Sequence, residues 1–186
     1  PKEIKKWLAV ADQFEKLFNK DIFENDISEI AVTGICNTIS RFKNNGIKNE
    51  EIVELYSELI ERFKKSKREI LEALATRALI ENIFSEQGKP KEAQVLADQS
   101  FTSFSLATSK FIITDVLGKL YWNSKDADTG RKYLRYAVEF QAVDQVNFFE
   151  TLLYAAVSIS DVDPNQAQVY CQQAVEISEN KQDYHE

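Results

Sequence analysis

Residues 84–97 read FSEQGKPKEAQVLA, and this stretch decides the fold because it ends one helix and begins the next. Gly88 tolerates the left-handed backbone that closes a helix. Pro90 suits the first turn of the following helix, where its missing N–H is not needed. Ala93 then opens a new apolar stripe. The stretch predicts a tight connection between two helices, and the same pattern of stop and restart occurs along most of the chain.

The rest of the chain has helical spacing of its apolar residues and no strand alternation. Five glycines and three prolines among 186 residues leave room for long helices. Apolar side chains recur three and four positions apart, which predicts an all-α fold of about eight or nine antiparallel helices with short loops. We expect helices at 3–18 and 27–44, a third capped by Asn49, a fourth begun by a capping box of Ser66 and Glu69, and further helices at 91–104, 107–123, 127–142, 145–159 and 164–180, the last capped by Asp163.

The connection at 84–97 belongs to a series with a step of 37 residues. Small residues are needed where two helices of a hairpin cross closely, so repeated columns of small residues indicate repeated hairpins. In the second helices the columns are Ala93, Gly130 and Ala167, then Ala97, Leu134 and Cys171, then Ser100, Ala137 and Ala174; in the first helices one column is Glu81, Gly118 and Ala155.

This column pattern resembles the tetratricopeptide repeat (TPR), a 34-residue helical hairpin with a leucine–glycine pair and an aromatic residue in its first helix and small residues in its second. The best copy is LGKLY at 117–121 together with Gly130 and Ala137. The resemblance covers about residues 74–180, and more loosely 30–65, where we expect a degenerate repeat. It implies an α-solenoid of stacked hairpins.

The departures from the family pattern matter for the architecture. Glu81 stands where a small residue belongs, no copy ends in proline, and the step exceeds that of the family by three residues. We therefore describe the chain as TPR-like. We expect N-terminal helices in residues 1–68 and three hairpins in residues 69–186, within one continuous domain.

The resemblance also implies a concave groove, lined by the first helices of the hairpins, that binds a protein or a peptide. An asparagine there can hold a peptide backbone, Lys119 can meet a carboxylate and Trp122 can bury an apolar anchor. Alternatively, Lys119 and Asp115 form a surface ion pair and Trp122 covers the neighbouring hairpin. The family's groove positions fall on Ala78, Asn82 and Glu86, on Asp115, Lys119, Trp122 and Asn123, and on Leu152, Ala156 and Ile159, of which Asn82, Glu86, Asp115, Lys119, Trp122 and Asn123 are the expected partner-binding residues. A clamp for a terminal carboxylate is not expected, because only Asn82 and Lys119 match one.

The charge distribution argues against nucleic acid or an anionic membrane as a partner. The net charge is −7, and residues 71–186 hold 10 basic and 17 acidic side chains, a balance that repels phosphate. The basic run at 62–68 is interpreted as a solvated helix end. No stretch approaches a membrane span or a signal peptide. Two cysteines, Cys36 and Cys171, point to a reducing compartment such as the cytoplasm.

We find no catalytic or metal motif in the sequence. The single histidine, His185, lies next to the end of the chain, and both cysteines are interpreted as small core residues. The acidic clusters at 126–130 and 161–165 lack the glycine and the final carboxylate of a calcium-binding EF-hand loop, so helix capping explains them better. The sequence therefore predicts a non-catalytic protein-binding scaffold without a cofactor.

Three alternatives remain open at this stage. The first is a peptide-responsive regulatory sensor, similar to bacterial regulators whose helical repeats follow a DNA-binding head, although no such head is visible here. The second is a helical enzyme domain with carboxylate chemistry. The third is a unit that associates with a second copy of itself to form a homodimer. The chain begins at Pro1 and contains no methionine, so it could be part of a longer protein whose other domains carry an activity.

Overall fold

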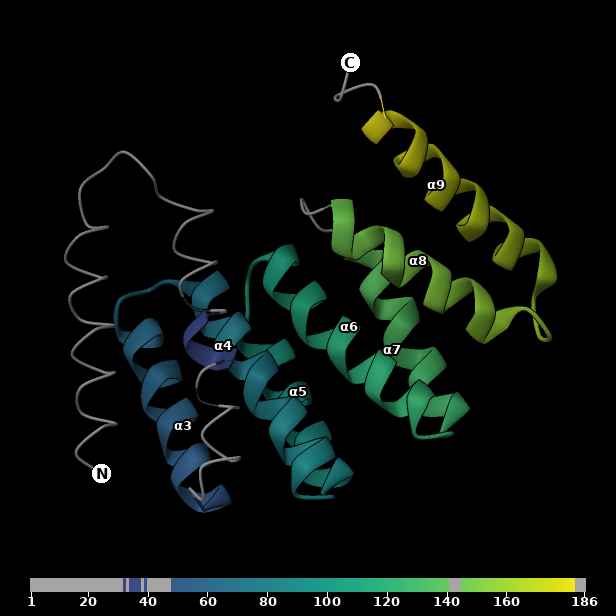
Figure 1. Cartoon of the computed structure of the whole chain (residues 1–186). Coiled ribbons are helices and arrows are strands. Elements are labelled where there is room, and N and C mark those ends of the chain that lie inside the picture. The colour runs from purple at the N-terminus through teal and green to yellow at the C-terminus, as the bar shows by residue number, and fades with distance from the viewer. Residues whose placement is uncertain (1–31, 33, 38, 40–47, 141–144, 183–186) are drawn as a thin grey trace.

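The computed structural model describes residues 32, 34–37, 39, 48–140 and 145–182, and these residues are helical apart from short connections (Figure 1). Within these ranges no strand occurs, so the predicted all-α class is confirmed. The expected helix at 3–18 and most of the one at 27–44 lie outside the described residues. The elements are α3 (Asn49–Lys65), α4 (Glu69–Glu81), the π-helix η2 (Asn82–Glu86), α5 (Pro90–Ser103), α6 (Ala107–Asn123), α7 (Ala127–Glu139), α8 (Gln145–Ile159) and α9 (Pro164–Gln182).

The connection at residues 84–97 has the predicted geometry. Gly88 adopts a left-handed backbone with a φ of 66°, and Pro90 is the first residue of α5. The π-helix just before it was not predicted. At the end of this π-helix, the backbone N–H of Gln87 donates to the carbonyl of Asn82, five residues back, at 3.2 Å. This longer spacing widens the turn that follows α4.

Two predicted helix caps are confirmed and two are wrong. Asp126 and Asp163 each accept a hydrogen bond from the backbone N–H three residues on, at 3.2 and 3.0 Å, so capping accounts for both acidic clusters. Asn49, by contrast, is already helical and follows the N-cap Lys48. Ser66 is the C-cap of α3 rather than the start of α4: its backbone N–H and its hydroxyl both donate to the carbonyl of Arg62, each at 3.0 Å.

Glu69 has a different role from the predicted capping box. Its carboxylate accepts the backbone N–H of Ser105 at 2.9 Å, the Ser105 hydroxyl at 2.6 Å and the backbone N–H of Leu106 at 2.7 Å. Leu106 is the N-cap of α6 and has no capping side chain of its own. A residue of α4 therefore stabilises the start of α6, 36 positions further along the chain.

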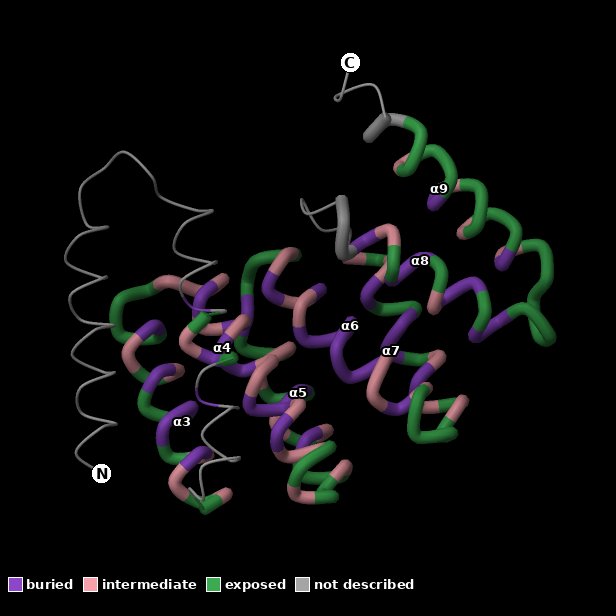
Figure 2. The backbone as a smooth tube through the Cα atoms, in the orientation of Figure 1, coloured by how far each residue is buried: buried purple, intermediate pink, exposed green. Residues whose placement is uncertain are grey.

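Each helix packs against the next along the chain, and α4 also packs against α6. Figure 1 shows the elements following one another across the molecule, with α9 far from α3. The buried side chains form three successive clusters (Figure 2). The first joins Val32, Cys36 and Ile39 to α3 and α4, the second joins α4, α5 and α6 to Tyr133 of α7, and the third joins α6 and α7 to α8 and α9. Contact between α6 and α8 is sparser than that between α4 and α6.

The predicted small-residue columns explain how α6 and α7 approach each other. A Cβ atom added to Gly118 would lie 2.8 Å from Cγ of Leu134, and one added to Gly130 would lie 2.7 Å from the backbone nitrogen of Trp122. The hairpin therefore closes only because both positions are glycine. Ala137 and Ala174, in the third column, are buried as expected.

Cys171 contradicts its predicted place in the core, because its side chain is exposed. Helix α9 packs through Ala167 and Ala174, which are buried. Cys171 is four residues after the first and three before the second, so helical spacing places it on the same side of α9, but its side chain is not covered. Among the described elements none follows α9 to cover it, and Figure 2 shows that most of α9 is exposed. Cys36 is buried, as predicted, and accepts a hydrogen bond through its backbone carbonyl from the Tyr56 hydroxyl at 3.0 Å.

Candidate binding groove

A pocket of about 330 Å³ lies between the end of the first helix of one hairpin and the first helix of the next, and we call it the α4–α6 groove. It is polar along its rim and apolar along part of its wall. Its lining residues are Arg77, Ala78 and Glu81 of α4, Asn82, Ser85 and Glu86 of η2, and Val116, Lys119, Leu120 and Asn123 of α6.

The π-helix supplies three of the lining residues. Asn82 is only 6% exposed, and its side-chain oxygen accepts a hydrogen bond from Nε2 of Gln87 at 3.1 Å. Within the described chain its amide nitrogen has no such partner, so two N–H donors at the groove wall remain available to a ligand. Single π turns inside helices are frequent at functional sites, and this one places Asn82, Ser85 and Glu86 along one side of the groove.

The apolar part of the wall comes from both helices. Ala78 lies on the α4 side, while Val116 and Leu120 lie one turn apart on the α6 side. Val116 is 3% exposed and belongs to the cluster that joins α4, α5 and α6. An apolar wall beside a few convergent polar groups is the usual composition of a ligand-binding site.

Lys119 is held by two carboxylates. Its ammonium nitrogen lies 3.0 Å from Oδ1 of Asp115 and 2.7 Å from Oε2 of Glu150. It also lies 5.5 Å from the centroid of the Tyr154 ring. Because both carboxylates neutralise it, the ammonium is a poor receptor for the carboxylate of a ligand, which was its predicted role.

Asp115 is the buried centre of this network, and its side chain is 3% exposed. It accepts a hydrogen bond from the Thr151 hydroxyl of α8 at 2.6 Å. The pairing with Lys119 follows the alternative prediction, except that Asp115 is buried and Lys119 half-buried rather than both on the surface. Asp115 therefore connects α6 to α8 and does not line the groove.

The structure brings four of the six expected partner-binding residues together. Asn82, Glu86, Lys119 and Asn123 line the α4–α6 groove, together with Ala78. Trp122 does not line it. This residue is half-buried, and its backbone lies against Gly130 of α7. The three positions expected on the third hairpin do not line this groove. They lie on the buried side of α8: Leu152, Ala156 and Ile159 are all buried.

Five groove residues were missed by the sequence reasoning, namely Arg77, Glu81, Ser85, Val116 and Leu120. Helical geometry could have identified four of them, since they lie next to predicted positions or one turn from them on α4 and α6. Arg77 and Glu81 form an ion pair with 3.1 Å between Nε and Oε1. Ser85 reaches the groove through the π turn, for which the sequence carries no clear signal.

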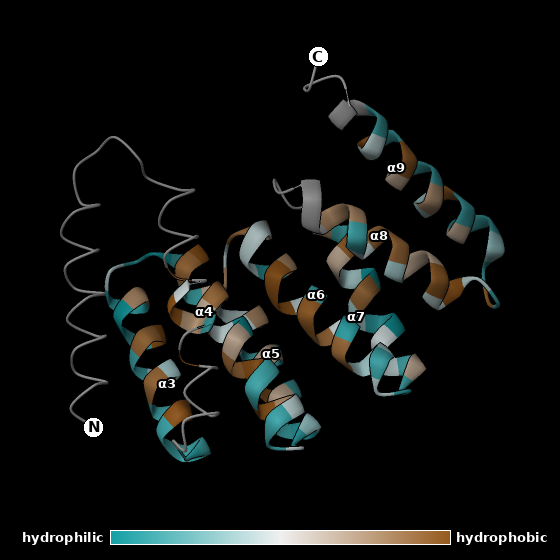
Figure 3. Cartoon of the chain, viewed as in Figure 1, coloured by the Kyte–Doolittle hydropathy of each residue, from teal (hydrophilic) through white to brown (hydrophobic). Residues whose placement is uncertain are grey.

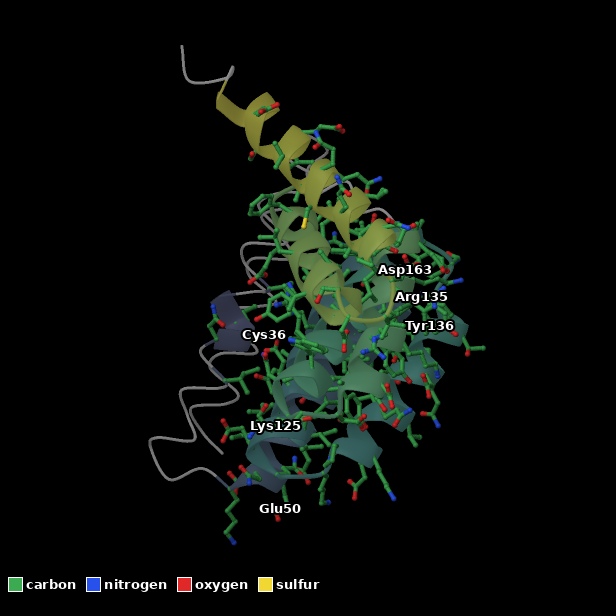
Figure 4. All side chains as sticks on the ribbon, turned by 90° about the vertical axis from the view of Figure 1, so that its right-hand side faces the viewer. Cys36, Glu50, Lys125, Arg135, Tyr136 and Asp163 are labelled. Carbon is green, nitrogen blue, oxygen red and sulfur yellow. The ribbon has the colours of Figure 1, made fainter. Side chains whose placement is uncertain are left out.

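The described residues include no group of three or more His, Cys, Asp or Glu side chains that could hold a metal ion. Burial, with a smaller contribution from the negative charge of Glu81, raises the pKa of the Cys36 thiol to about 12, so this thiol is a weak nucleophile at neutral pH. Figures 1 and 4 show Cys36 far from α9, which carries Cys171. In the parts of the chain that the structure describes, we find no helix with the length and apolar character needed to cross a membrane.

No protein-family model matches the chain, and no curated protein or solved structure matches it at a significant level. The likeness to TPR proteins therefore remains a prediction from the residue pattern.

Proposed function

We propose that this chain is a non-catalytic binding module, a TPR-like α-solenoid whose α4–α6 groove holds a peptide segment of a protein partner. The observation that carries the proposal is the groove, which is lined by the polar Asn82 together with the apolar Val116 and Leu120. The packing of successive hairpins and the glycine-mediated crossing of α6 and α7 support the stacked architecture.

A peptide matches this site better than a compact small molecule does. The volume of about 330 Å³ is near the lower limit for ligand pockets, and the groove lies between the ends of two helices. An extended backbone offers one carbonyl per residue, which the Asn82 amide can meet, and its side chains can rest on Val116 and Leu120. The free thiols of Cys36 and Cys171 support the proposal of a reducing, cytoplasmic setting.

Affinity capture with groove variants tests the proposal. Wild-type chain, Asn82→Ala, Leu120→Ser and a control, Val95→Ser, are immobilised and exposed to lysate of the source cell, and captured proteins are quantified by mass spectrometry. Val95 is 55% exposed on α5 and does not line the groove. We expect a set of proteins that the wild type and Val95→Ser retain and that both groove variants lose, while circular dichroism shows all four folded. Equal capture by all four would contradict the groove function.

A further inference from the structure

The charged side chains that line the α4–α6 groove already have partners within the chain. Nε of Arg77 lies 3.1 Å from Oε1 of Glu81, one turn further along α4. The Lys119 ammonium lies 2.7 Å from Oε2 of Glu150, and Glu86 also takes part in an interaction within the chain. A ligand therefore meets no unpaired charge among the described lining residues.

The polar groups of the groove that stay free are neutral. Within the described residues, the side chains of Ser85 and Asn123 form no hydrogen bond, and Asn82 uses only its amide oxygen. Amide and hydroxyl groups can pair with the carbonyl and N–H groups of a peptide backbone without any charge on the ligand.

The remaining surface of the groove is apolar. Figure 3 shows hydrophobic residues dominating the middle of α6, the helix that supplies Val116 and Leu120 to the wall. A side chain that rests on this wall gains stability from the apolar area that it removes from water, and a charged group there would lose part of its hydration instead.

A charged ligand side chain gains little in return for that loss. To find a counter-charge it must break the pair of Arg77 with Glu81 or that of Lys119 with Glu150. Both side chains of the first pair are more than one-third exposed, and such pairs are worth about 0–1 kcal/mol. Exchanging one of them for another leaves the desolvation of the ligand charge uncompensated, whereas an uncharged ligand leaves both pairs intact.

We propose that the partner segment is uncharged and aliphatic where it crosses the α4–α6 groove, and that the pairing of Arg77 with Glu81 determines this selectivity. The main chain of the segment meets the free amide groups, and its side chains rest on Val116 and Leu120. This inference rests on the proposed peptide-binding function and adds the chemical class of the ligand and the residues that select it.

Selection from a random peptide library on phage tests the class of ligand. The immobilised full chain enriches 12-residue peptides, and the enriched peptide, labelled with fluorescein, is titrated by fluorescence anisotropy. We expect a consensus run of Leu, Ile, Val or Ala without Lys, Arg, Asp or Glu. Its dissociation constant should change by less than about twofold between about 0.05 and 0.5 M NaCl, because no ion pair with the ligand is there to be screened.

Variants of the ion pair test the selectivity. Two derivatives of the enriched peptide carry Lys or Glu in place of one central aliphatic residue, and the wild type should bind both more weakly than the parent peptide. Arg77→Gln exposes Glu81 and should shift the ratio of the two affinities toward the Lys peptide by roughly two- to fivefold at low salt. Glu81→Gln exposes Arg77 and should shift the ratio toward the Glu peptide.

The matched controls are Arg62→Gln and Glu58→Gln. These residues form an Arg–Glu pair on α3 with the same spacing of four residues and similar exposure, with 2.9 Å between Nη2 and Oε1, and neither lines the groove. We expect both controls to leave the ratio of the two affinities unchanged, while circular dichroism shows all four variants folded.

Each other outcome overturns a distinct statement. A charged consensus, a salt-dependent affinity, or equal ratios for Arg77→Gln and Arg62→Gln overturns this inference, and the groove function stands if Asn82→Ala and Leu120→Ser still weaken binding. Failure to enrich any peptide that depends on Asn82 and Leu120 overturns the groove function as well. If the chain alone sediments as a dimer that Leu120→Ser dissociates, the groove holds a second copy and the inference is wrong.

Discussion

The substitution Gly118→Ala sets two physical effects against each other at the crossing of α6 and α7. Helix propensity favours alanine over glycine by about 1 kcal/mol in a helix interior. The new methyl group, however, would lie 2.8 Å from Cγ and 2.9 Å from the backbone nitrogen of Leu134. Because a backbone atom cannot rotate away as a side-chain tip can, α7 must shift by several tenths of an ångström.

The steric effect should decide the sign. Inserting a methyl group into a closely packed core costs about 1–3 kcal/mol, and the contact with a backbone atom favours the upper half of that range. After subtracting the propensity gain of about 1 kcal/mol, we expect a net loss of roughly 1–2 kcal/mol of unfolding free energy. For a chain of this size that corresponds to a melting temperature lower by roughly 2–8 °C. Thermal and urea unfolding followed by circular dichroism measure both quantities.

A matched control isolates propensity from packing. A Cβ atom added to the exposed, helical Gly34 would meet nothing within 4 Å, so Gly34→Ala should raise stability by roughly 0.5–1 kcal/mol. In a Leu134→Ala background, part of the contact is removed, and Gly118→Ala should cost less there than in the wild type. If Gly118→Ala is as stable as the wild type or more so, the close crossing does not depend on glycine and the reasoning is refuted.

Three further predictions concern the contacts that connect distant segments. Burial alone would raise the pKa of Glu69, but the hydrogen bonds from Ser105 and Leu106 outweigh it and lower this pKa. The stability that these bonds contribute is present above the ordinary carboxyl pKa of 4.5 and is lost as the pH falls through the lowered pKa. Glu69→Gln should therefore cost about 1–2 kcal/mol at neutral pH and flatten this acid dependence, as measured by urea unfolding between about pH 3 and 7, and an unchanged pH profile would argue against the contact. Asp115→Ala should cost roughly 2–3 kcal/mol in the same assay, because it removes the buried carboxylate that lies 3.0 Å from the Lys119 ammonium and accepts the Thr151 hydroxyl at 2.6 Å, and Asp115→Asn should cost less since its amide oxygen still accepts. With the thiol reagent DTNB, the exposed Cys171 should react in the native state and the buried Cys36 only after unfolding; equal reaction of both thiols in the native state would contradict the described burial.

The groove illustrates which parts of a binding site a pattern can predict. Asn82, Lys119 and Asn123 were predicted because the groove positions of the TPR family fall on them. Asp115 also falls on such a position, yet its carboxylate is buried and accepts a hydrogen bond from Thr151, which lies 36 residues further along the chain. Whether a position on a helix faces a ligand or a neighbouring helix depends on how the hairpins stack, which the spacing alone leaves open.

The sequence by itself determined the helices and their connections. The left-handed turn at Gly88, the helix start at Pro90 and the caps at Asp126 and Asp163 depend on backbone conformation and on hydrogen bonds between residues only a few positions apart. Such local chemistry can be recognised from residue types alone.

Only the tertiary structure decided the partners of side chains that lie far apart in the sequence. It pairs Glu69 with the start of α6, joins Lys119 to Glu150 and leaves Cys171 exposed on α9. It also ends α4 in a π turn that carries Asn82 into the groove. These outcomes depend on the angles and distances between packed helices, which are set by the sum of many weak contacts rather than by any one residue.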